Sequence, residues 1–394
     1  MVTSGRVAIA GGSLGGLTTG LVLRDLGIDV TIFERSPAEL QERGAGIGLL
    51  PETYRYLVER AGVPLDEIST LTTHIRYLSR SGDVVHDDGH DYRFSSWNTV
   101  YRRLLGCFGR DRYRLGAEVT GFASRADGVD VELAGDTSDP FDLLVCADGI
   151  GSHFRRELLP GVEPLYAGYV AWRGMVPITC LDPAVVDRLE DAITYFVYAN
   201  SHVLVYPIPG QDGSVERQRR LMNFVWYRNY LAGGDLADVL TDVNGLPHEI
   251  SLPPGAARPD HVAELRATAQ ARLPAPIASV VLAAEAPFVQ VIFDVEVSRM
   301  AFGRVCLVGD AAWVARPHAA AGTAKAAADG WALAAALAAH DDVPSALAAW
   351  EPGQLALGRQ LVDRTRRIGA RSQVEGNWRP GDPELIFGLE APGR

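Results

Sequence analysis

The sequence has almost no lysine. Lys325 is the only one, and the rest of the 37 basic residues are arginine. Acidic residues number 49, which gives a formal net charge of −12 at pH 7. A chain this acidic lacks the general positive charge with which proteins bind nucleic acid or anionic membranes, so we expect neither partner. A genome that favours arginine codons explains the skew, and it draws attention to the single retained lysine.

Cysteine is also scarce, and its spacing excludes two kinds of site. The four cysteines lie far apart and form no CxxC pair. The sequence therefore indicates neither a zinc site nor a disulfide framework, and we expect no metal. Cys146 and Cys306 fall in apolar, strand-like runs, where buried free thiols fit a reducing cytoplasm. An uninterrupted apolar run of about 20 residues is missing, so we expect no membrane span.

What is present is typical of a folded protein with two or three domains. The 394 residues exceed the roughly 100–200 of one domain, and 47% are apolar against 22% charged. Residues 6–34 read as strand, glycine turn, helix and strand, which is a βαβ unit. A later helix is expected to be capped by Asn98 or Thr99, and alanine-rich helices are expected at 322–340 and 344–368.

The middle of the chain has a different pattern. Segments between residues 166 and 295 are rich in β-branched and aromatic residues, which predicts a largely antiparallel sheet, with helical stretches near 235–242 and 260–272. The expected fold class is α/β, with a Rossmann-like nucleotide-binding domain, an inserted, mostly antiparallel β-sheet domain and C-terminal helices. The expected boundaries are 1–73, 98–165 and 296–372 for the nucleotide-binding domain, 74–97 and 166–295 for the sheet domain, and 373–394 for an irregular tail.

The first motif is the turn GGSLGG, which fills the pattern GxGxxG with one departure. Gly11 opens the tight turn, Gly16 allows close packing of helix on strand, and Ser13 replaces the glycine that approaches the pyrophosphate. Serine is small enough for that approach, and its hydroxyl can itself bond a phosphate at the helix N-terminus. Glu34 ends the second strand, as expected of the acid that holds an adenosine ribose. The unit predicts dinucleotide binding, and the alternative is an empty Rossmann-like unit.

Two further motifs each join the end of a buried strand to a helix. In the first, Asp148 follows the run FDLLVC, and the alternative to a ligand-binding role is an ordinary helix cap. In the second, Gly309 and Asp310 follow RVCLV, and Asp310 can bond a ribityl or ribose hydroxyl. A helix then starts near Gly322 and directs its dipole at whatever lies before it.

In this order and at these separations, the three motifs resemble those of the flavoprotein aromatic hydroxylases of the para-hydroxybenzoate hydroxylase fold, the group A FAD monooxygenases. The segments AGYVAWRG, VYPIPG, FVWYRN, RPHAAAGTAKA and GDPELIFGL resemble those of members that hydroxylate hydroxypyridines. The resemblance implies FAD as cofactor, NADH or NADPH as transient co-substrate, and O2. It also implies that a flavin C4a-hydroperoxide hydroxylates an electron-rich, hydroxylated N-heteroaromatic or phenolic ring.

The resemblance further implies which residues contact FAD. Glu34 would hold the adenosine ribose, Arg102 would approach the pyrophosphate, and Asp148 would serve both FAD and the visiting nicotinamide. The full set implied for the cofactor is Gly11, Ser13, Leu14, Gly16, Glu34, Arg35, Arg43, Gly46, Ile47, Arg102, Asp148, Gly309, Asp310, Gly322 and Thr323.

Candidates for the chemistry lie near the third motif and in the central sheet. By resemblance, Pro317 would lie near the reactive edge of the flavin. His318 follows it and can then reach the substrate or move a proton, and the alternative is a surface loop histidine. Tyr206 alternates with His202 and Leu204 on one strand face, where it can bond a ring oxygen or nitrogen, or it is a core tyrosine.

Four further residues are candidates for substrate binding. Phe224 and Trp226 share one face of a strand, although such residues are more often core. Arg228 can bind an anionic group, and the alternative is a solvated arginine at a strand end. Trp313 stands where a histidine is common in the family. Trp172 and Arg173, in the segment AWRG, rank below these.

Lys325 falls three residues into the helix that starts near Gly322. Because every other basic position carries arginine, we expect Lys325 near the flavin or the helix-start loop, where the bulkier guanidinium does not fit. The alternative is an ordinary surface lysine. Nearby, Ala320 and Ala324 replace a Gly and an Asn that are usual in the family, which weakens the expectation of hydrogen bonds to the pyrimidine ring of the flavin.

The prediction is a cytoplasmic, FAD-dependent aromatic monooxygenase for a small aromatic substrate, with a homodimer as one candidate assembly. One alternative is a tailoring hydroxylase or epoxidase of a larger aromatic or indole natural product. A second is a flavin reductase or dehydrogenase that never oxygenates, and a third is a nucleotide-binding carrier without turnover. The sequence has no second GxGxxG for NAD(P)H, which is expected of a donor that binds transiently.

Overall fold

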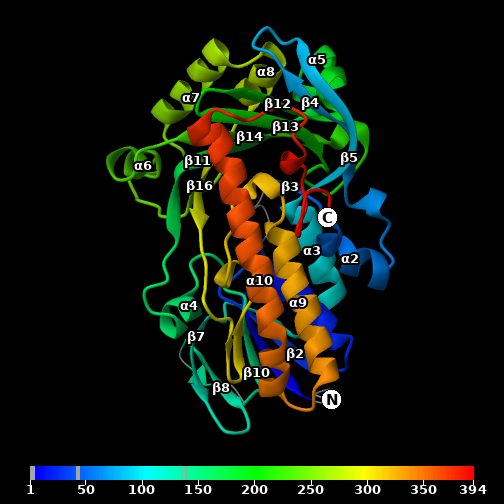
Figure 1. Ribbon diagram of the computed structural model, residues 1–394, viewed down its shortest axis with the longest axis vertical. Helices are drawn as coiled ribbons and strands as arrows, with labels where there is room; N and C mark the ends of the chain where they lie inside the picture. The colour runs from blue at the N-terminus through cyan, green and yellow to red at the C-terminus, as the bar shows by residue number, and fades with distance from the viewer. Residues whose placement is uncertain (1–4, 41–44, 135, 138–139) are drawn as a thin grey trace.

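The protein is elongated, with two large sheets at opposite ends of its long axis (Figure 1). The computed structural model describes residues 5–40, 45–134, 136–137 and 140–394. The long helices α9 (Gly322–Ala339) and α10 (Val343–Ala370) pack on each other and run along the molecule between the two ends (Figure 1). The C-terminus lies between the sheets, close to the short strand β3 (Gly46–Gly48) (Figure 1).

A six-stranded sheet forms the lower end of the molecule in Figure 1, with the order β17-β18-β10-β1-β2-β6. The strands from β18 to β6 run parallel, and β17 is antiparallel to β18. The central strands are apolar and buried along almost their whole length, as is usual for a parallel sheet covered on both faces. The strands are β1 (Arg6–Ala10), β2 (Asp29–Glu34), β6 (Tyr113–Leu115), β10 (Leu143–Cys146), β17 (Ala301–Phe302) and β18 (Val305–Leu307).

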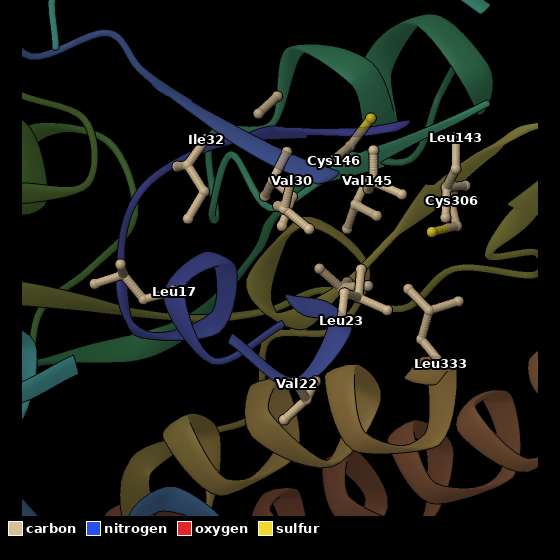
Figure 2. Close-up of a cluster of buried hydrophobic side chains, with 14 of the residues drawn as sticks. Leu17, Val22, Leu23, Val30, Ile32, Leu143, Val145, Cys146, Cys306 and Leu333 are labelled. Atoms are coloured by element: carbon tan, nitrogen blue, oxygen red, sulfur yellow. The ribbon is translucent and has the colours of Figure 1, made fainter. Parts of the chain in front are cut away.

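Helix α1 (Leu14–Arg24) fills the space between this sheet and α9. Figure 2 shows side chains of α1, β2 and α9 gathered in one apolar cluster, among them Leu23, Ile32 and Leu333, which are all fully buried. The two helices approach closely, because a Cβ on Gly330 of α9 would lie only 2.6 Å from Oγ1 of Thr19. The small residues of the alanine-rich helix are therefore what allow α9 to pack on α1.

Helix α3 (Trp97–Phe108) also packs on α1. Its cap differs from the prediction: Oγ of Ser96 accepts a hydrogen bond of 3.0 Å from the backbone N–H of Thr99. The predicted caps, Asn98 and Thr99, are wrong because the helix starts earlier. The other elements at this end are α2 (Pro51–Arg55), α4 (His153–Leu158) and a small antiparallel sheet of β7 (Val119–Ser124), β8 (Val129–Leu133) and β9 (Asp136–Thr137).

A nine-stranded sheet forms the other end, with the order β15-β16-β11-β14-β13-β12-β4-β5-β3. Neighbouring strands are antiparallel except β12 and β4, which run parallel. The predicted fold class, an α/β protein with an inserted and mostly antiparallel sheet, is confirmed. The strands, besides β3, are β4 (Thr70–Leu78), β5 (Val84–Ser96), β11 (Leu165–Pro177), β12 (Ala192–Tyr198), β13 (Ser201–Ile208), β14 (Leu221–Asn229), β15 (Ser251–Leu252) and β16 (Phe288–Asp294).

The two faces of this sheet are covered differently. Trp172, Phe224 and Trp226 lie in a core cluster with residues of the helices on the outer face. Leu204, Tyr206, Val225 and Tyr227 lie on the opposite face, toward the rest of the molecule. The sequence predicted the helices α6 and α7 but not α5 and α8. The helices of this end are α5 (Pro183–Leu189), α6 (Gly234–Val239), α7 (Pro259–Arg272) and α8 (Ala275–Ala283).

The segment after α10 has little regular structure but is held firmly. The buried guanidinium of Arg364 donates to the carbonyl oxygens of Gly388, at 2.9 Å, and of Ile386. The backbone N–H of Phe387 donates to the Tyr92 hydroxyl at 2.9 Å. These contacts fix Phe387 against the sheet. Among the described residues no helix is both long and apolar enough to cross a membrane, and no cluster of His, Cys, Asp or Glu side chains could hold a metal ion.

Candidate active site

The turn between β1 and α1 can only be built with small residues. Gly11 has φ 108°, and a Cβ there would lie 2.3 Å from the carbonyl oxygen of Ala147. A Cβ on Gly16 would lie 2.0 Å from the carbonyl oxygen of Gly11. Ser13 occupies the N-cap position of α1, yet its side chain makes no capping hydrogen bond. The serine hydroxyl and the first amides of α1 are therefore placed to meet an anion, as at other nucleotide-binding helix ends.

A first cavity of about 410 Å³ lies beside this turn, at the carboxyl ends of β1 and β2. Glu34 lines it, and its buried carboxylate accepts hydrogen bonds of 2.9 Å from the N–H groups of both Gly12 and Ser36. A carboxylate has about four acceptor positions, so two remain for the hydroxyls of a ribose. Arg35 also lines this cavity. The smaller cavity thus has the size and the acceptor expected of an adenosine site.

Asp148 lies on the opposite wall of the first cavity. Its carboxylate accepts from Oγ of Ser152 at 2.6 Å and from the backbone N–H of His153 at 2.8 Å, at the start of α4. Arg155, fully buried in the same helix, donates to the carbonyl oxygens of Ile150, at 2.5 Å, and Ala311, at 3.2 Å. Asp148 therefore stabilises the start of α4, and Arg155 connects this helix to the turn that contains Asp310 and Ala311.

A second cavity, of about 810 Å³, lies between the two sheets. The nucleotide-binding end contributes glycine turns and short loops, and the nine-stranded sheet contributes aromatic and apolar side chains. Residues predicted from the sequence that line it are Ser13, Leu14, Gly46, Ile47, Tyr206, Gly309, Asp310, Pro317, Gly322 and Thr323. Residues that line it from the sheet and the C-terminal segment include Phe94, Arg173, Leu204, Val225, Tyr227, Gln290, Ile292 and Phe387.

The Gly309 turn at the base of this cavity is supported from below by Lys325. The Lys325 ammonium, 2% exposed, donates to both carboxylate oxygens of Asp329 at 2.7 Å. Asp329 in turn accepts from the backbone N–H of Gly309 at 2.8 Å. Lys325 thus lies under the helix-start loop, as its isolation among arginines predicted, and an ordinary surface position is excluded.

Asp310, next in this turn, faces the cavity with an exposed carboxyl group. Desolvation by the surrounding protein raises its pKa to about 6, although Lys325 and Arg155 act to lower it. At neutral pH the group is still mostly a carboxylate, which accepts hydrogen bonds from the hydroxyls of a polyol chain such as the ribityl group.

The backbone of Gly46 is clamped by three side chains of the nine-stranded sheet. Its N–H donates to Oδ1 of Asn223 at 3.0 Å, and its carbonyl oxygen accepts from the Tyr206 hydroxyl at 2.9 Å and from Nη2 of Arg173. A Cβ on Gly46 would lie 2.8 Å from both Asn223 and Tyr206, so only glycine fits. Burial raises the pKa of Tyr206, and Arg173 opposes the rise, so this phenol stays neutral.

Two arginines predicted for the cofactor have different outcomes. Arg102 points elsewhere, since its Nη2 donates to the carbonyl oxygen of Gln211 and it lines neither cavity. Arg43 lies outside the described residues.

His318 does not reach the second cavity, although the neighbouring Pro317 lines it. The histidine is buried, and its Nε2 is 2.7 Å from the Tyr169 hydroxyl, with the ring of Tyr227 at 4.8 Å. Burial, together with repulsion from His202 and Arg316, lowers the pKa of His318 well below its usual value. The predicted histidine is therefore a neutral member of an inner core and not a group facing the substrate.

The four predicted substrate-binding residues all lie away from the cavity. Phe224 and Trp226 point to the opposite face of β14, into the core under α7 and α8. Arg228 forms a bidentate ion pair with Glu264, with both contacts at 2.8 Å. Trp313 is buried against Met300, whose Sδ accepts from the indole N–H at 3.3 Å. On β14, the residues that face the cavity are Val225 and Tyr227, each of which is a direct neighbour of a predicted residue.

The residues and spaces present fit FAD. The two cavities meet at the glycine turn, because Ser13, Ala147 and Gly149 line both. Glu34 would hold the ribose in the smaller cavity, the start of α1 would hold the pyrophosphate, and Asp310 would hold the ribityl chain in the larger one. Gly11 and Gly16 let the backbone close into the tight turn that places the start of α1 beside both cavities.

The fold and the two joined cavities define a flavin-binding oxidoreductase. Comparison with known families agrees: one described as "FAD binding domain" matches residues 265–365, and one described as "FAD binding domain-like" matches residues 166–294. The chain is 37% identical over 388 residues to 2,6-dihydroxypyridine 3-monooxygenase of Paenarthrobacter nicotinovorans, covering 98% of this chain and 96% of that protein. The chain belongs to the family of FAD-dependent aromatic monooxygenases, and FAD is its cofactor.

Solved structures support the same assignment. The structure of 2,6-dihydroxypyridine-3-hydroxylase from Arthrobacter nicotinovorans is similar with a TM-score of 0.93 and 36% identity, covering 99% of this chain and 98% of that one. Klebsiella pneumoniae HpxO, complexed with FAD and uric acid, shares the fold with a TM-score of 0.76 and 24% identity, covering 94% of this chain and 89% of that one. As in other monooxygenases that use FAD, O2 and NADH or NADPH are the co-substrates.

Proposed function

We propose that this enzyme hydroxylates a small, hydroxylated N-heteroaromatic ring of the hydroxypyridine class. The observation that carries the proposal is the second cavity, where the loops that fit the flavin face a wall whose described side chains are mostly aromatic and apolar. Phe94, Tyr206 and Tyr227 form the aromatic part of this wall, and Arg173 and Gln290 form the polar part. The similarity to a dihydroxypyridine monooxygenase over nearly the whole chain supports the same class of substrate.

Bound FAD supplies the activation of O2 after its reduction by NADH or NADPH. The residues of the chain provide the site in which that chemistry is productive. Leu204, Val225 and Phe387 line the sheet side of the cavity and exclude water from it. The aromatic wall orients a planar ring against the loops of Gly46 and Pro317, so that one edge of the ring faces the cofactor side.

Tyr206 has a defined role in hydrogen bonding. Its proton is directed to the carbonyl oxygen of Gly46, so the phenol oxygen can accept a hydrogen bond from a ring N–H or O–H but does not donate one. Because its pKa is raised, Tyr206 is not a base at neutral pH. Pro317 lines the cavity and shapes it without offering an N–H group.

A screen of hydroxypyridines, phenols and indoles tests this proposal against its alternatives. We expect hydroxypyridines to stimulate NADH or NADPH oxidation together with O2 uptake, and the product to gain one oxygen atom. Stimulation only by larger indoles would favour a tailoring enzyme. Substrate-dependent NADH oxidation without O2 uptake would show a dehydrogenase or reductase.

The cellular location and the assembly are also proposals. A cytoplasmic location is supported by the cysteines: the buried thiols of Cys146 and Cys306 are unpaired, as are the exposed ones of Cys107 and Cys180. Fractionation of the host cell tests the location, and light scattering of the purified protein tests whether it is a homodimer.

A further inference from the structure

Arg173 lies in the middle of the sheet wall of the second cavity. It belongs to β11, between β14 and β16, where it pairs with Val225 on one side and Phe288 on the other. Its neighbour Trp172 is buried in the core of the opposite face. Strand alternation therefore directs Arg173 into the cavity, and it is among the residues that line it.

All the hydrogen-bond partners of Arg173 are neutral. Its Nη1 donates to Oε1 of Gln290 at 3.0 Å, and its Nη2 donates to the carbonyl oxygen of Gly46. Its Nε is shielded from solvent and has no partner in the described part of the chain. No described residue forms an ion pair with Arg173, so no carboxylate in the described part of the chain compensates its charge.

Other cations in the protein are treated differently. Lys325 is paired with Asp329 and Arg316 with Asp294, and both of these carboxylates are buried. The guanidinium of Arg364 donates to backbone carbonyls, although its Nε has no partner among the described residues, and Arg364 lines neither cavity.

Among the described residues that line the second cavity, Arg173 is the one cation, and no described residue forms an ion pair with it. The described lining of the second cavity contains no other arginine, lysine or histidine. Its one carboxyl group, Asp310, belongs to the Gly309 turn on the cofactor side. A half-buried cation without a carboxylate partner gains from an anionic one, and among the described residues the open space beside this guanidinium is the second cavity.

We propose that Arg173 binds the negatively charged oxygen of the substrate, so that the enzyme selects aromatic rings that carry an anionic group. The group is either an ionised ring hydroxyl or a carboxylate on the ring, since a guanidinium binds both in the same way. This inference rests on the proposed function, because it assumes that the substrate is a small aromatic ring in this cavity.

The arrangement around Arg173 fits such a ligand. Gln290 offers an amide N–H beside the guanidinium, and the rings of Tyr206 and Tyr227 line the same cavity. Holding the oxygen as an anion also keeps the ring electron-rich, which favours attack on an electrophilic oxygen atom. Arg173 would therefore set both the affinity and the charge preference of the site.

The test measures dissociation constants of the FAD-loaded enzyme from the change in flavin absorbance on ligand titration. The probes are 2,6-dihydroxypyridine, 6-hydroxynicotinate and the uncharged 2,6-dimethoxypyridine. Two substitutions separate charge from hydrogen bonding. Arg173→Gln removes the charge but keeps an amide donor for the Gly46 carbonyl, and Arg173→Lys keeps the charge. Arg228→Gln is the matched control, because it removes the same charge from the next strand outside the cavity.

We expect Arg173→Gln to weaken binding of the anionic probes by about 10- to 100-fold, the usual effect of losing a charge-assisted hydrogen bond. Binding of the dimethoxypyridine should change by less than about threefold, and Arg173→Lys should retain most of the affinity for anions. Loss for only one of the two anionic probes identifies whether hydroxyl or carboxylate is recognised. For 2,6-dihydroxypyridine, affinity should rise with pH as the ligand ionises in wild type but not in Arg173→Gln.

Two results would overturn the inference. One is unchanged binding of both anionic probes in Arg173→Gln. The other is an equal loss for charged and uncharged probes, which would mean that Arg173 only supports Gly46. Turnover by wild type separates these outcomes from a failure of the proposed function: if no hydroxypyridine is hydroxylated or bound by wild-type enzyme, the substrate class is wrong and the inference falls with it.

Discussion

The ion pair of Lys325 and Asp329 makes a sharp prediction, because it supports the Gly309 turn without touching either cavity. Lys325→Met removes two hydrogen bonds of 2.7 Å and leaves Asp329, fully buried, with the Gly309 N–H as its remaining partner. Removing one member of a buried pair typically destabilises a protein by about 3–5 kcal/mol. That is a large fraction of the ~5–15 kcal/mol by which most domains are stable.

Two further variants refine this expectation. Lys325→Arg keeps the charge but adds volume at a site that is only 2% exposed, so a loss of about 1–3 kcal/mol is expected from overpacking. Combining Lys325→Met with Asp329→Asn removes the unpaired carboxylate, so the double variant should be more stable than Lys325→Met alone. With Asp329→Asn measured alone as well, the four proteins form a double-mutant cycle that gives the coupling free energy between the two side chains.

The effect of Lys325→Met should also depend on pH. Desolvation raises the pKa of Asp329, and Lys325 acts to lower it. Without the lysine the pKa rises further, so the folded protein favours the protonated carboxyl group. Stability gained from that protonation is present at low pH and is lost as the pH rises. The deficit of Lys325→Met should therefore grow as the pH rises above the ordinary range of a carboxyl group, by up to about 1.4 kcal/mol per pH unit.

Urea unfolding at saturating FAD, followed by tryptophan fluorescence, measures these differences, and FAD dissociation reports on the Gly309 turn. Arg359→Met is the control, because it removes a charge from an exposed position on α10 and should change stability by less than about 0.5 kcal/mol. The reasoning is refuted if both Lys325→Met and Lys325→Arg unfold within about 0.5 kcal/mol of wild type and retain FAD equally well.

Three other substitutions give expected results of different kinds. Ala320 has φ 54°, so Ala320→Gly should raise the free energy of unfolding by about 1 kcal/mol, and a loss in urea unfolding would contradict this. Burial lowers the pKa of His202 to about 3 and that of His318 well below its usual value. Because the unfolded state then binds protons that the folded state cannot, stability should fall by about 1.4 kcal/mol per histidine for each pH unit below about 6.5. His202→Gln should reduce that slope between pH 6.5 and 5, and an unchanged slope would disprove the assignment. Phe387→Ala should enlarge the cavity and raise kcat/KM for a hydroxyquinoline relative to a hydroxypyridine by about tenfold, whereas an unchanged ratio would place Phe387 outside the substrate site.

Much of the cofactor side of the site could be predicted from the sequence, because its signals are local. Gly11, Gly16 and Glu34 lie within one βαβ unit, where strand, turn and helix fix their relative positions. The position of Lys325 was also predictable, and its partner Asp329 follows at the spacing of one helical turn, which is a second local signal.

The substrate side could not be predicted in the same way. Alternation in β14 separates two faces, but only the packing of α7 and α8 shows that Phe224 and Trp226 belong to the covered one. The sequence gives no direct sign that Pro317 reaches the cavity while His318 turns into the core.

The role of Arg173 was also beyond prediction from the sequence. Its contacts with Gly46 and Gln290 join residues separated by 127 and 117 positions in the chain. Its importance comes from the lack of a carboxylate partner among the described residues, and a sequence motif does not record an absence of that kind.

The most direct test of the account is isotope incorporation from O2. Wild-type enzyme with FAD, NADH or NADPH and 2,6-dihydroxypyridine is incubated under 18O2, and the product is analysed by mass spectrometry. The account predicts a product that carries one 18O atom, formed in proportion to the NADH or NADPH consumed. A product without 18O, or oxidation of the nicotinamide with no oxygenated product, would contradict it.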